Sequence, residues 1–592
     1  MSNKNQKYVL SGILLITALV FANSLCNGFI ENLDDQGYVL NNEIIKHLDW
    51  NSVKTIFSTF CLGNYHPLTL FSYALDYKFF GLNPFFFHLT NYILHLLNTL
   101  LVYLFIKRFT GKFWVAIIVS LFFGIHPMHV ESVAWISERK DVLYTFFFLL
   151  SLISYVKYIE SEKKKSYLIL TFIWFLLSLL SKPAAVCLPL VLVLMDYYYK
   201  KRITWQILIN KAPFFIVAMF FAIIAVVGQR SSQSIYHLSL HYNILDRMCL
   251  INYSIVFYLV KIFAPFNLSV IHYYPTKSDG FLPLEYYFVF PFLVLLIWAV
   301  LKSGNFKREL IFGLLFFLIT IVEVLQIIPI GGAIVSERYS YVPYIGTFFI
   351  IGQFFSYIKN NELRYSLKIK PFITYTLLIS FILCFFATYE RNKIWKNGET
   401  LFTDTQSKYP NRGENWYELG LSRQLKMDFT TAKIDFSKAI QLAPYISDAY
   451  FQLGIIEGNN RNLDTAIMYF NDVLVLDSNN SDAYFDLAQI KNEKMDFLGA
   501  INEYNQTLKL NHLNSFAYYG RGLAKLSMKY FTEASADFSK AIELKANFAD
   551  AYFNRGVSEF YLNNKKNACQ DWQLAEQYGN QNATVVLNQY CK

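Results

Sequence analysis

Long uninterrupted apolar blocks fill the first two thirds of this 592-residue chain and constrain its fold more than any other feature. A helix needs about 20 mostly apolar residues, or slightly fewer, to cross the hydrocarbon layer of a membrane. The blocks predict eleven spans, at residues 8–25, 86–106, 113–126, 142–158, 166–181, 183–199, 212–228, 286–301, 309–329, 341–358 and 371–389. Because only helices and closed barrels satisfy their backbone in lipid, we expect an all-α, polytopic transmembrane bundle.

The Lys and Arg residues between the blocks predict the orientation of the bundle. If all eleven blocks cross the membrane, the basic clusters fall on one side, which the positive-inside rule makes cytoplasmic. These clusters are Lys4/Lys7, Lys107/Arg108/Lys112, Lys163/Lys164/Lys165, Lys200/Lys201/Arg202, Lys307/Arg308 and Lys368/Lys370. Block 8–25 lacks an A-x-A cleavage site, so we expect a retained first span and a cytoplasmic N-terminus. The apolar piece 248–263 would break the alternation, so it is predicted to be interfacial or re-entrant.

A different pattern begins near Glu390, where the composition becomes polar. Small residues recur every 34 residues after aromatic pairs, at Gly420, Gly454, Ala488, Gly522 and Gly556. This period is typical of tetratricopeptide repeats, helix-turn-helix units that stack into an α-solenoid. We therefore predict a transmembrane domain at 1–390, a connector at 391–413, five repeats at 414–583 and a C-terminal cap at 584–592.

The repeats predict a binding role, because stacked repeats present a concave groove to a partner. Eleven spans and a cytoplasmic N-terminus would place the repeats outside the cytoplasm. A protein or glycan acceptor is the expected occupant. A spacer or an oligomerisation module is the alternative.

The net charge of +10 does not predict nucleic-acid binding, because the basic residues lie in short clusters between apolar blocks. The seven Cys residues form no CxxC motif, which argues against a structural zinc site. Two pairs lie in regions expected outside, where disulfides can form: Cys26 with Cys61, and Cys569 with Cys591.

Two adjacent carboxylates, Asp34 and Asp35, follow the first span in the sequence LDDQGYV. Just outside the membrane, they could deprotonate an acceptor hydroxyl or help to hold a divalent cation. A solvated loop with a helix cap is the alternative. Further along, His66 in YHPLT leads back toward the membrane and is a candidate substrate-binding residue.

The densest group of ionisable residues lies at a predicted membrane boundary, in HPMHVESVAWISERKD. Its candidate substrate-binding residues are His126, His129, Glu131, Arg139, Lys140 and Asp141. Such residues are costly at this depth, which favours a functional site, although snorkelling by the cations is the alternative. The order HPMHVE lacks the HExxH arrangement of zinc peptidases, so zinc is not expected.

Two further cations, Lys182 and Arg338, are predicted at the same outer level. An Arg at this depth can bind a phosphate with two parallel hydrogen bonds. Together the two side chains would suit a lipid phosphate, and simple interfacial anchoring is the alternative.

The segments LDDQGYV, YHPLT, HLTNYILHLLN, FGIHPMHVESVAWISERKDVL and SERYSYVP, followed by the repeats, carry a family resemblance. The chain resembles the transmembrane and tetratricopeptide repeat-containing O-mannosyltransferases and their bacterial relatives. The resemblance implies a GT-C type glycosyltransferase that takes a sugar from a polyprenyl or dolichyl phosphate outside the cytoplasm. The short repeat array favours a bacterial inner-membrane protein with its repeats in the periplasm.

The resemblance also implies residue roles. An acidic side chain, here Asp34 or Asp35, would activate the acceptor hydroxyl for attack on the sugar C1, with inversion. Arg139, Lys140 and Arg338 would neutralise the departing phosphate. The pocket for the sugar or the phosphate would be shaped by His126, His129 and Glu131. The chain departs from the family at two positions. The family often has Arg at the position of His66, and an acidic residue after the Lys at the position of Pro183.

Two other function classes remain open. A membrane scaffold would need the repeats but not the acidic pair. A transporter of lipid-linked sugars tends to have binding sites near the bilayer midplane and paired internal repeats, whereas the ionisable residues here cluster at the outer boundary.

Overall fold

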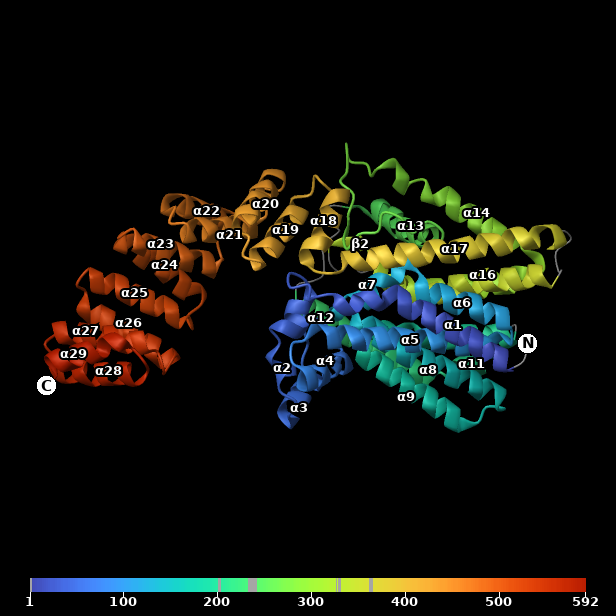
Figure 1. Cartoon of the computed structure of the whole chain (residues 1–592), viewed down its shortest axis with the longest axis horizontal. Coiled ribbons are helices and arrows are strands. Elements are labelled where there is room, and N and C mark those ends of the chain that lie inside the picture. Colours follow the sequence, from blue (N-terminus) through green and yellow to red (C-terminus); the bar gives the residue numbers. More distant parts are fainter. Residues whose placement is uncertain are drawn as a thin grey trace. The chain divides into compact units, whose positions relative to one another are not determined.

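The computed structural model describes residues 3–200, 204–232, 242–325, 327, 332–360 and 366–591. They form two compact units, Met1–Lys408 and Tyr409–Lys592, so the predicted connector is divided between the units. Figure 1 shows that both units consist mainly of helices. The expected all-α class is therefore confirmed.

The first unit is a helix bundle with two short strands. Its longer helices are α1 Asn3–Phe21, α3 Trp50–Ser58, α4 Pro67–Phe80, α5 Pro84–Thr110, α6 Phe113–Ile125, α8 Arg139–Glu160, α9 Lys165–Ser181, α10 Leu188–Lys200, α12 Ala212–Ser231, α13 Ile244–Lys261, α14 Val289–Lys302, α15 Lys307–Ile321, α16 Tyr344–Lys359, α17 Ser366–Ile394 and α18 Gly398–Lys408. The shorter ones are α2 Glu43–Lys46, α7 Val130–Ala134 and α11 Trp205–Ile209. Strands β1 His272–Tyr273 and β2 Ala333–Val335 pair antiparallel. Helix α5 packs against α6 and α8, and α8 packs against α9. Helix α1 lies beside α5 and α6 (Figure 1).

Each of the eleven predicted spans overlaps one of these α-helices. Not every helix is long enough to cross a membrane. Six described helical stretches are long and apolar enough: Lys4–Cys26, Pro84–Thr110, Ile136–Glu160, Ala212–Ser231, Leu284–Lys302 and Lys370–Ile394. A seventh results if Phe113–Ile125 and Pro127–Ala134, bent by 57°, form one span. Helices α9, α10, α15 and α16 have 17, 13, 15 and 16 residues. At 1.5 Å per residue they reach only about 20–26 Å, less than a hydrocarbon layer of about 30 Å.

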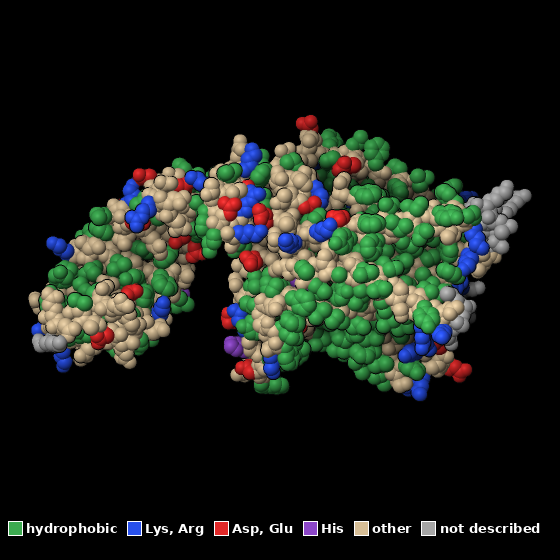
Figure 2. Space-filling model, in the orientation of Figure 1, with side chains coloured by type: hydrophobic (Ala, Val, Ile, Leu, Met, Phe, Trp, Pro, Cys, Tyr) green, Lys and Arg blue, Asp and Glu red, His purple; other side chains and the backbone are tan. Residues whose placement is uncertain are grey.

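One end of the bundle collects the predicted cytoplasmic basic clusters. Arg108 at the end of α5 forms an ion pair of 2.5 Å with Glu160 at the end of α8. Lys112 donates a hydrogen bond of 2.9 Å to Gln353 of α16. Figure 2 shows hydrophobic side chains covering the flank of the bundle, with charged side chains gathered toward its ends. Lys201 and Arg202 of the predicted clusters lie outside the described residues.

The predicted interfacial piece 248–263 lies mostly within helix α13, which is not one of the six long apolar stretches. Its Tyr258 is buried and donates a hydrogen bond of 2.9 Å to the Ser336 carbonyl. The helix thus packs on the strand β2 segment. Its depth in the membrane stays a prediction.

The second unit contains five helix pairs in the predicted register. The pairs are α19 Gly413–Leu425 with α20 Phe429–Leu442, α21 Ser447–Asn459 with α22 Leu463–Leu476, α23 Ser481–Glu493 with α24 Phe497–Leu510, α25 Ser515–Ser527 with α26 Phe531–Leu544, and α27 Ala549–Tyr561 with α28 Lys565–Gln577. Helix α29, Gln581–Tyr590, follows them. The recurring glycines lie where the two helices of a pair meet: a Cβ on Gly454 would lie 2.7 Å from the Phe470 ring.

We expect Gly454→Val to lower the free energy of unfolding of the repeat unit by about 1–3 kcal/mol, because the added methyl groups overpack the contact with Phe470. Thermal unfolding of the full chain, followed by circular dichroism, measures the change. Gln441→Val is the matched control, since it adds the same β-branched side chain at an exposed position of α20. A loss with Gly454→Val that is no larger than the loss with Gln441→Val would contradict the packing role of Gly454, because Val is a better helix former than Gly.

Cys569 and Cys591 form a disulfide that ties α28 to the end of α29, as predicted. The other predicted pair is wrong, since Cys26 and Cys61 are both free thiols. The bond closes a loop with a sequence separation of 22 residues. We expect Cys569→Ser/Cys591→Ser to destabilise the repeat unit by about 3 kcal/mol, because the unfolded chain gains freedom. A reducing agent should lower the unfolding midpoint of the wild type but leave that of the double variant unchanged.

Candidate functional site

A cavity of about 420 Å³ opens at the end of the bundle where α8 begins and α9 ends. Its ionisable lining residues are Asp34, His66, Glu138, Lys140, Lys182, Glu323 and Arg338. The polar residues Asn64, Gln229, Ser336 and Tyr339 complete much of the wall. Five of the residues predicted from the sequence therefore meet at one hollow, although they come from segments far apart in the chain.

The two adjacent carboxylates occupy different environments. The Asp34 side chain is 43% exposed and lines the cavity, with one oxygen 3.4 Å from the Lys140 ammonium. Asp35 is fully buried and accepts hydrogen bonds from the Ile30 amide at 2.8 Å and the Ser137 amide at 2.9 Å, and from the Ser137 hydroxyl. Asp35 thus ties the loop that carries Asp34 to the start of α8, and it acts as a positioning residue.

Burial makes Asp35 sensitive to pH, since it raises the pKa of this carboxyl from 3.8 to about 6 despite the three hydrogen bonds. The native state therefore binds more protons than the unfolded state between these two values, and stability falls as the pH rises through them. We expect the unfolding free energy of the wild type, minus that of Asp35→Asn, to fall by about 2 kcal/mol from pH 4 to pH 7. Denaturant titrations at several pH values measure this difference. A difference that does not change with pH would contradict the assignment.

The three cations of the cavity are each held by carboxylates. Lys140 lies 3.1 Å from Glu138, and Lys182 lies 2.5 Å from Asp141. Arg338 pairs with Glu131 and also approaches Glu138 at 3.3 Å. These contacts fix the three cations around one hollow, whose lining also holds the carboxylates of Asp34, Glu138 and Glu323.

His66 caps the start of α4 and contributes a neutral ring to the wall. Its ring lies 5.0 Å from that of Tyr38, and its side chain is buried. Burial lowers the pKa of His66 to about 3, with further lowering by Lys140 and Lys182. Its Nε2 is buried and has no hydrogen-bond partner among the described residues.

The remaining predicted site residues lie behind the cavity wall and not on it. His126 contacts the Ile262 carbonyl at 3.2 Å, and His129 contacts the Phe123 carbonyl at 2.8 Å. Arg139 is fully buried against Asp76, at 2.5 Å. Glu131 and Asp141 are buried too and act on the cavity through the cations that they hold, Arg338 and Lys182.

Sequence reasoning missed two lining carboxylates, Glu138 and Glu323. Glu138 belongs to the ionisable group at residues 126–141, so its charge at the predicted membrane boundary was the signal that could have found it. Glu323 could have been found because it is an ionisable residue inside the otherwise apolar block 309–329.

A divalent cation at Asp34 and Asp35 receives limited support from the geometry. The Asp35 oxygens are occupied by backbone and Ser137 donors, so Asp34 is the member of the pair that faces the cavity. Within the described ranges, no three His, Cys, Asp or Glu side chains converge as metal ligands.

Comparison with known proteins finds a repeat family and mannosyl-transferase relatives. A tetratricopeptide repeat family profile matches residues 517–548, in the α25–α26 pair. The mouse protein O-mannosyl-transferase TMTC2 is 34% identical over 113 residues, 19% of this chain and 13% of that protein. The Caenorhabditis elegans protein O-mannosyl-transferase F38B6.6 is 28% identical over 196 residues, 30% of this chain and 27% of that protein.

Among solved structures, the crystal structure of YrrB, a TPR protein with an unusual peptide-binding site, covers 32% of this chain and 97% of its own, with 18% identity and a TM-score of 0.30. The matches to the two mannosyl-transferases span between 13% and 27% of the length of those relatives. Over these parts, the chain is similar to protein O-mannosyl-transferases of the TMTC type, and it carries tetratricopeptide repeats.

Proposed function

We propose that this protein is a membrane O-mannosyltransferase that moves a mannose-like sugar from a polyprenyl phosphate to a hydroxyl group of a protein or glycan outside the cytoplasm. The similarity to protein O-mannosyl-transferases supports the reaction class. The observation that carries the site is that an accessible carboxylate, Asp34, shares one cavity with three cationic side chains.

In the proposed reaction, Asp34 accepts the proton of the acceptor hydroxyl, and the hydroxyl oxygen of the acceptor forms a bond to the sugar C1. The bond between C1 and the phosphate oxygen breaks, and its electron pair leaves with the lipid phosphate, so the configuration at C1 inverts. Lys140, Lys182 and Arg338 stabilise the charge that develops on the phosphate. No further reactant is needed.

Neutral His66 suits a different task from the three cations. Because its pKa is low, the ring carries no charge at neutral pH and adds nothing to phosphate binding. Its ring also lines the cavity, where a sugar could pack against it. We infer that His66 takes part in recognition of the sugar and not of the lipid phosphate.

The proposed orientation has the basic end of the bundle in the cytoplasm and the Asp34 cavity outside. The positive-inside rule supports the first part. The Cys569–Cys591 disulfide supports an oxidising compartment for the repeats, which in a bacterial inner-membrane protein is the periplasm.

The repeat unit offers a surface for the acceptor. A hollow of about 350 Å³ lies among α23, α24 and α25, and its apolar lining includes Phe485, Phe516 and Leu523. The polar side chains of Gln489 and Asn492 share this lining. Apolar and aromatic walls with a few polar groups are typical of ligand-binding pockets.

The test incubates the purified full chain in lipid nanodiscs with a panel of labelled polyprenyl-phosphate sugars and Ser/Thr peptides. Mass spectrometry then identifies the labelled product. We expect transfer from the mannosyl donor. Absence of transfer from every donor, together with full biological function of Asp34→Asn in cells, would favour the membrane scaffold instead.

A further inference from the structure

A second cavity, of about 250 Å³, lies at the other end of α8, among the last turn of α8, the start of α9, the end of α10 and the helix α11. Lys140 of the first cavity and Tyr158 of the second are 18 residues apart on α8, about 27 Å along the helix. Its ionisable side chains other than tyrosines are Lys163, Lys200, Lys211 and Asp196. This cavity has no part in the proposed transfer reaction.

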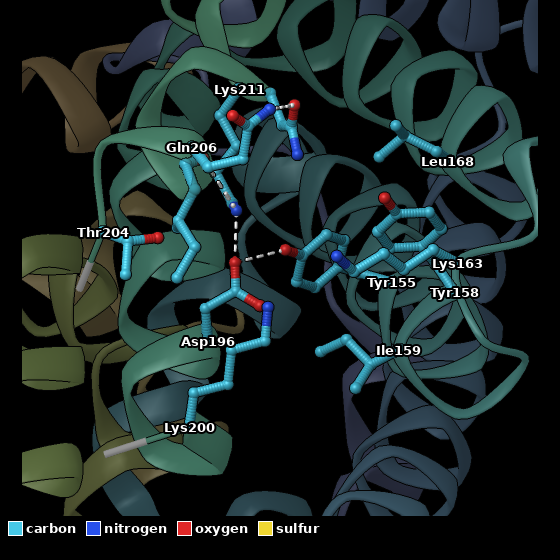
Figure 3. Close-up of a pocket in the computed structure, with 12 residues that line it drawn as sticks. Tyr155, Tyr158, Ile159, Lys163, Leu168, Asp196, Lys200, Thr204, Gln206 and Lys211 are labelled. Carbon is cyan, nitrogen blue, oxygen red and sulfur yellow. Dashed lines mark hydrogen bonds and ion pairs between the residues drawn. The ribbon is translucent and has the colours of Figure 1, made fainter. Parts of the chain in front are cut away.

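Its floor is a buried ion pair whose charges cancel. Asp196 accepts a hydrogen bond of 2.7 Å from the Tyr155 hydroxyl and is paired with Lys211, and both partners of the pair are buried (Figure 3). A buried pair with this additional hydrogen bond is well satisfied. Asp196 therefore has little capacity left to neutralise other cations.

Two lysines remain above this floor. Lys163 and Lys200 are exposed and line the cavity, and the structure records no ion pair for either of them among the described residues. With Lys211 cancelled by Asp196, the lining carries an excess of two positive charges. Such a hollow attracts an anion.

The surroundings indicate that this end of the bundle lies at the membrane surface. Trp205 and Ile209 of α11 are 80% and 61% exposed, next to the lining residues Thr204 and Gln206. Exposed Trp beside Lys is typical of the interface between lipid tails and headgroups. The cavity is smaller than the roughly 300–1,000 Å³ of sites for drug-sized ligands, so it suits a headgroup.

We propose that this cavity binds a phosphate group, with Lys163 and Lys200 as its ligands and an anionic phospholipid headgroup as the favoured source. Basic pockets between helices near the membrane surface recognise such headgroups. The site would fix the depth of this end of the bundle in the membrane. The proposal does not depend on the transferase activity.

The experiment measures the thermal unfolding midpoint of the detergent-purified full chain as three probes are titrated: dioctanoyl phosphatidylglycerol, dioctanoyl phosphatidylcholine and inorganic phosphate. A ligand that binds the native state raises the midpoint with its concentration. We expect a rise with phosphatidylglycerol and none with phosphatidylcholine. If inorganic phosphate gives the rise as well, the site accepts a free phosphate and the phosphate chemistry still holds.

The variant Lys163→Gln/Lys200→Gln should weaken the apparent affinity for phosphatidylglycerol by about 30-fold. Each lysine near the membrane surface contributes about 1 kcal/mol, and each 1.4 kcal/mol changes an affinity about tenfold. The control Lys164→Gln/Lys165→Gln removes the same charge from exposed neighbours that do not line the cavity, and should change it less than about 3-fold. All four side chains are exposed, so the fold should persist, and each single variant provides a second measure. Equal weakening in both doubles, or no midpoint rise with any probe, would overturn the proposal.

Discussion

Asp34→Asn should reduce sugar transfer at least about 100-fold, because an amide cannot accept the acceptor proton and a general base contributes about 10²–10⁴-fold. The unfolding midpoint should stay close to that of the wild type, since the side chain is 43% exposed and makes one long contact, 3.4 Å, with Lys140. The loss should appear in kcat, with donor binding largely retained. Initial rates with a labelled mannosyl donor, measured in nanodiscs, give the ratio.

Glu43→Gln is the matched control for this experiment. Glu43 lies in the same outer loop, is 74% exposed and is paired with Lys46, but it does not line the cavity. The control should keep the wild-type rate within about twofold, as expected for exposed sites without a special role. Transfer by Asp34→Asn at more than half the wild-type rate would remove Asp34 from the catalytic role.

Arg338→Gln should produce the largest combined loss, in stability and in transfer. The Arg338 amide donates a hydrogen bond of 3.0 Å to the fully buried Glu131, and its guanidinium pairs with the same carboxylate. Removing one partner leaves a buried charge without compensation, which costs about 3–5 kcal/mol. We therefore expect a markedly lower unfolding midpoint together with at least about a 100-fold loss of transfer, similar to removal of one oxyanion donor.

A double variant separates the two roles of Arg338. Glu131→Gln/Arg338→Gln removes both charges, so much of the stability should return. Transfer should stay low, because the group that faces the leaving phosphate is still absent. If the double variant regains wild-type transfer, Arg338 acts only through folding and has no role in phosphate stabilisation.

The sequence predicted the helices well because two strong periodic signals carried them. Apolar blocks marked every helix of the predicted eleven, and the 34-residue spacing of residues such as Gly454 fixed the register of the repeats. It could not fix helix lengths. Pro183, for example, begins a 3₁₀ turn over Pro183–Cys187, which shortens α10 to 13 residues.

The candidate site was predicted in part, because sequence shows which residues are ionisable but not which way their side chains point. Asp34 and Asp35 are neighbours with the same chemistry, yet one lines the cavity and the other binds Ser137 of a distant helix. His126 and His129 belong to the densest ionisable group, but their rings bind backbone carbonyls inside the bundle. Only tertiary contacts make these distinctions.

The second cavity was not predicted as a site, although Lys163 and Lys200 belong to recognised basic clusters. Basic residues near membrane spans are normally explained by orientation alone. Asp196 and Lys211 are 15 residues apart in the chain, and their pairing under these lysines follows only from the packing of the helices around the cavity.

The Asp34 cavity should hold the sugar donor, and photo-cross-linking can locate the bound donor. The full chain in nanodiscs is illuminated with a polyprenyl-phosphate mannose that carries a photoreactive group on the sugar, and the labelled peptides are mapped by mass spectrometry. We predict labels on residues of the Asp34 cavity wall, such as His66 and Tyr339, and competition by unlabelled donor. Labels that gather instead around Lys163 and Lys200, or that unlabelled donor does not displace, would contradict the account.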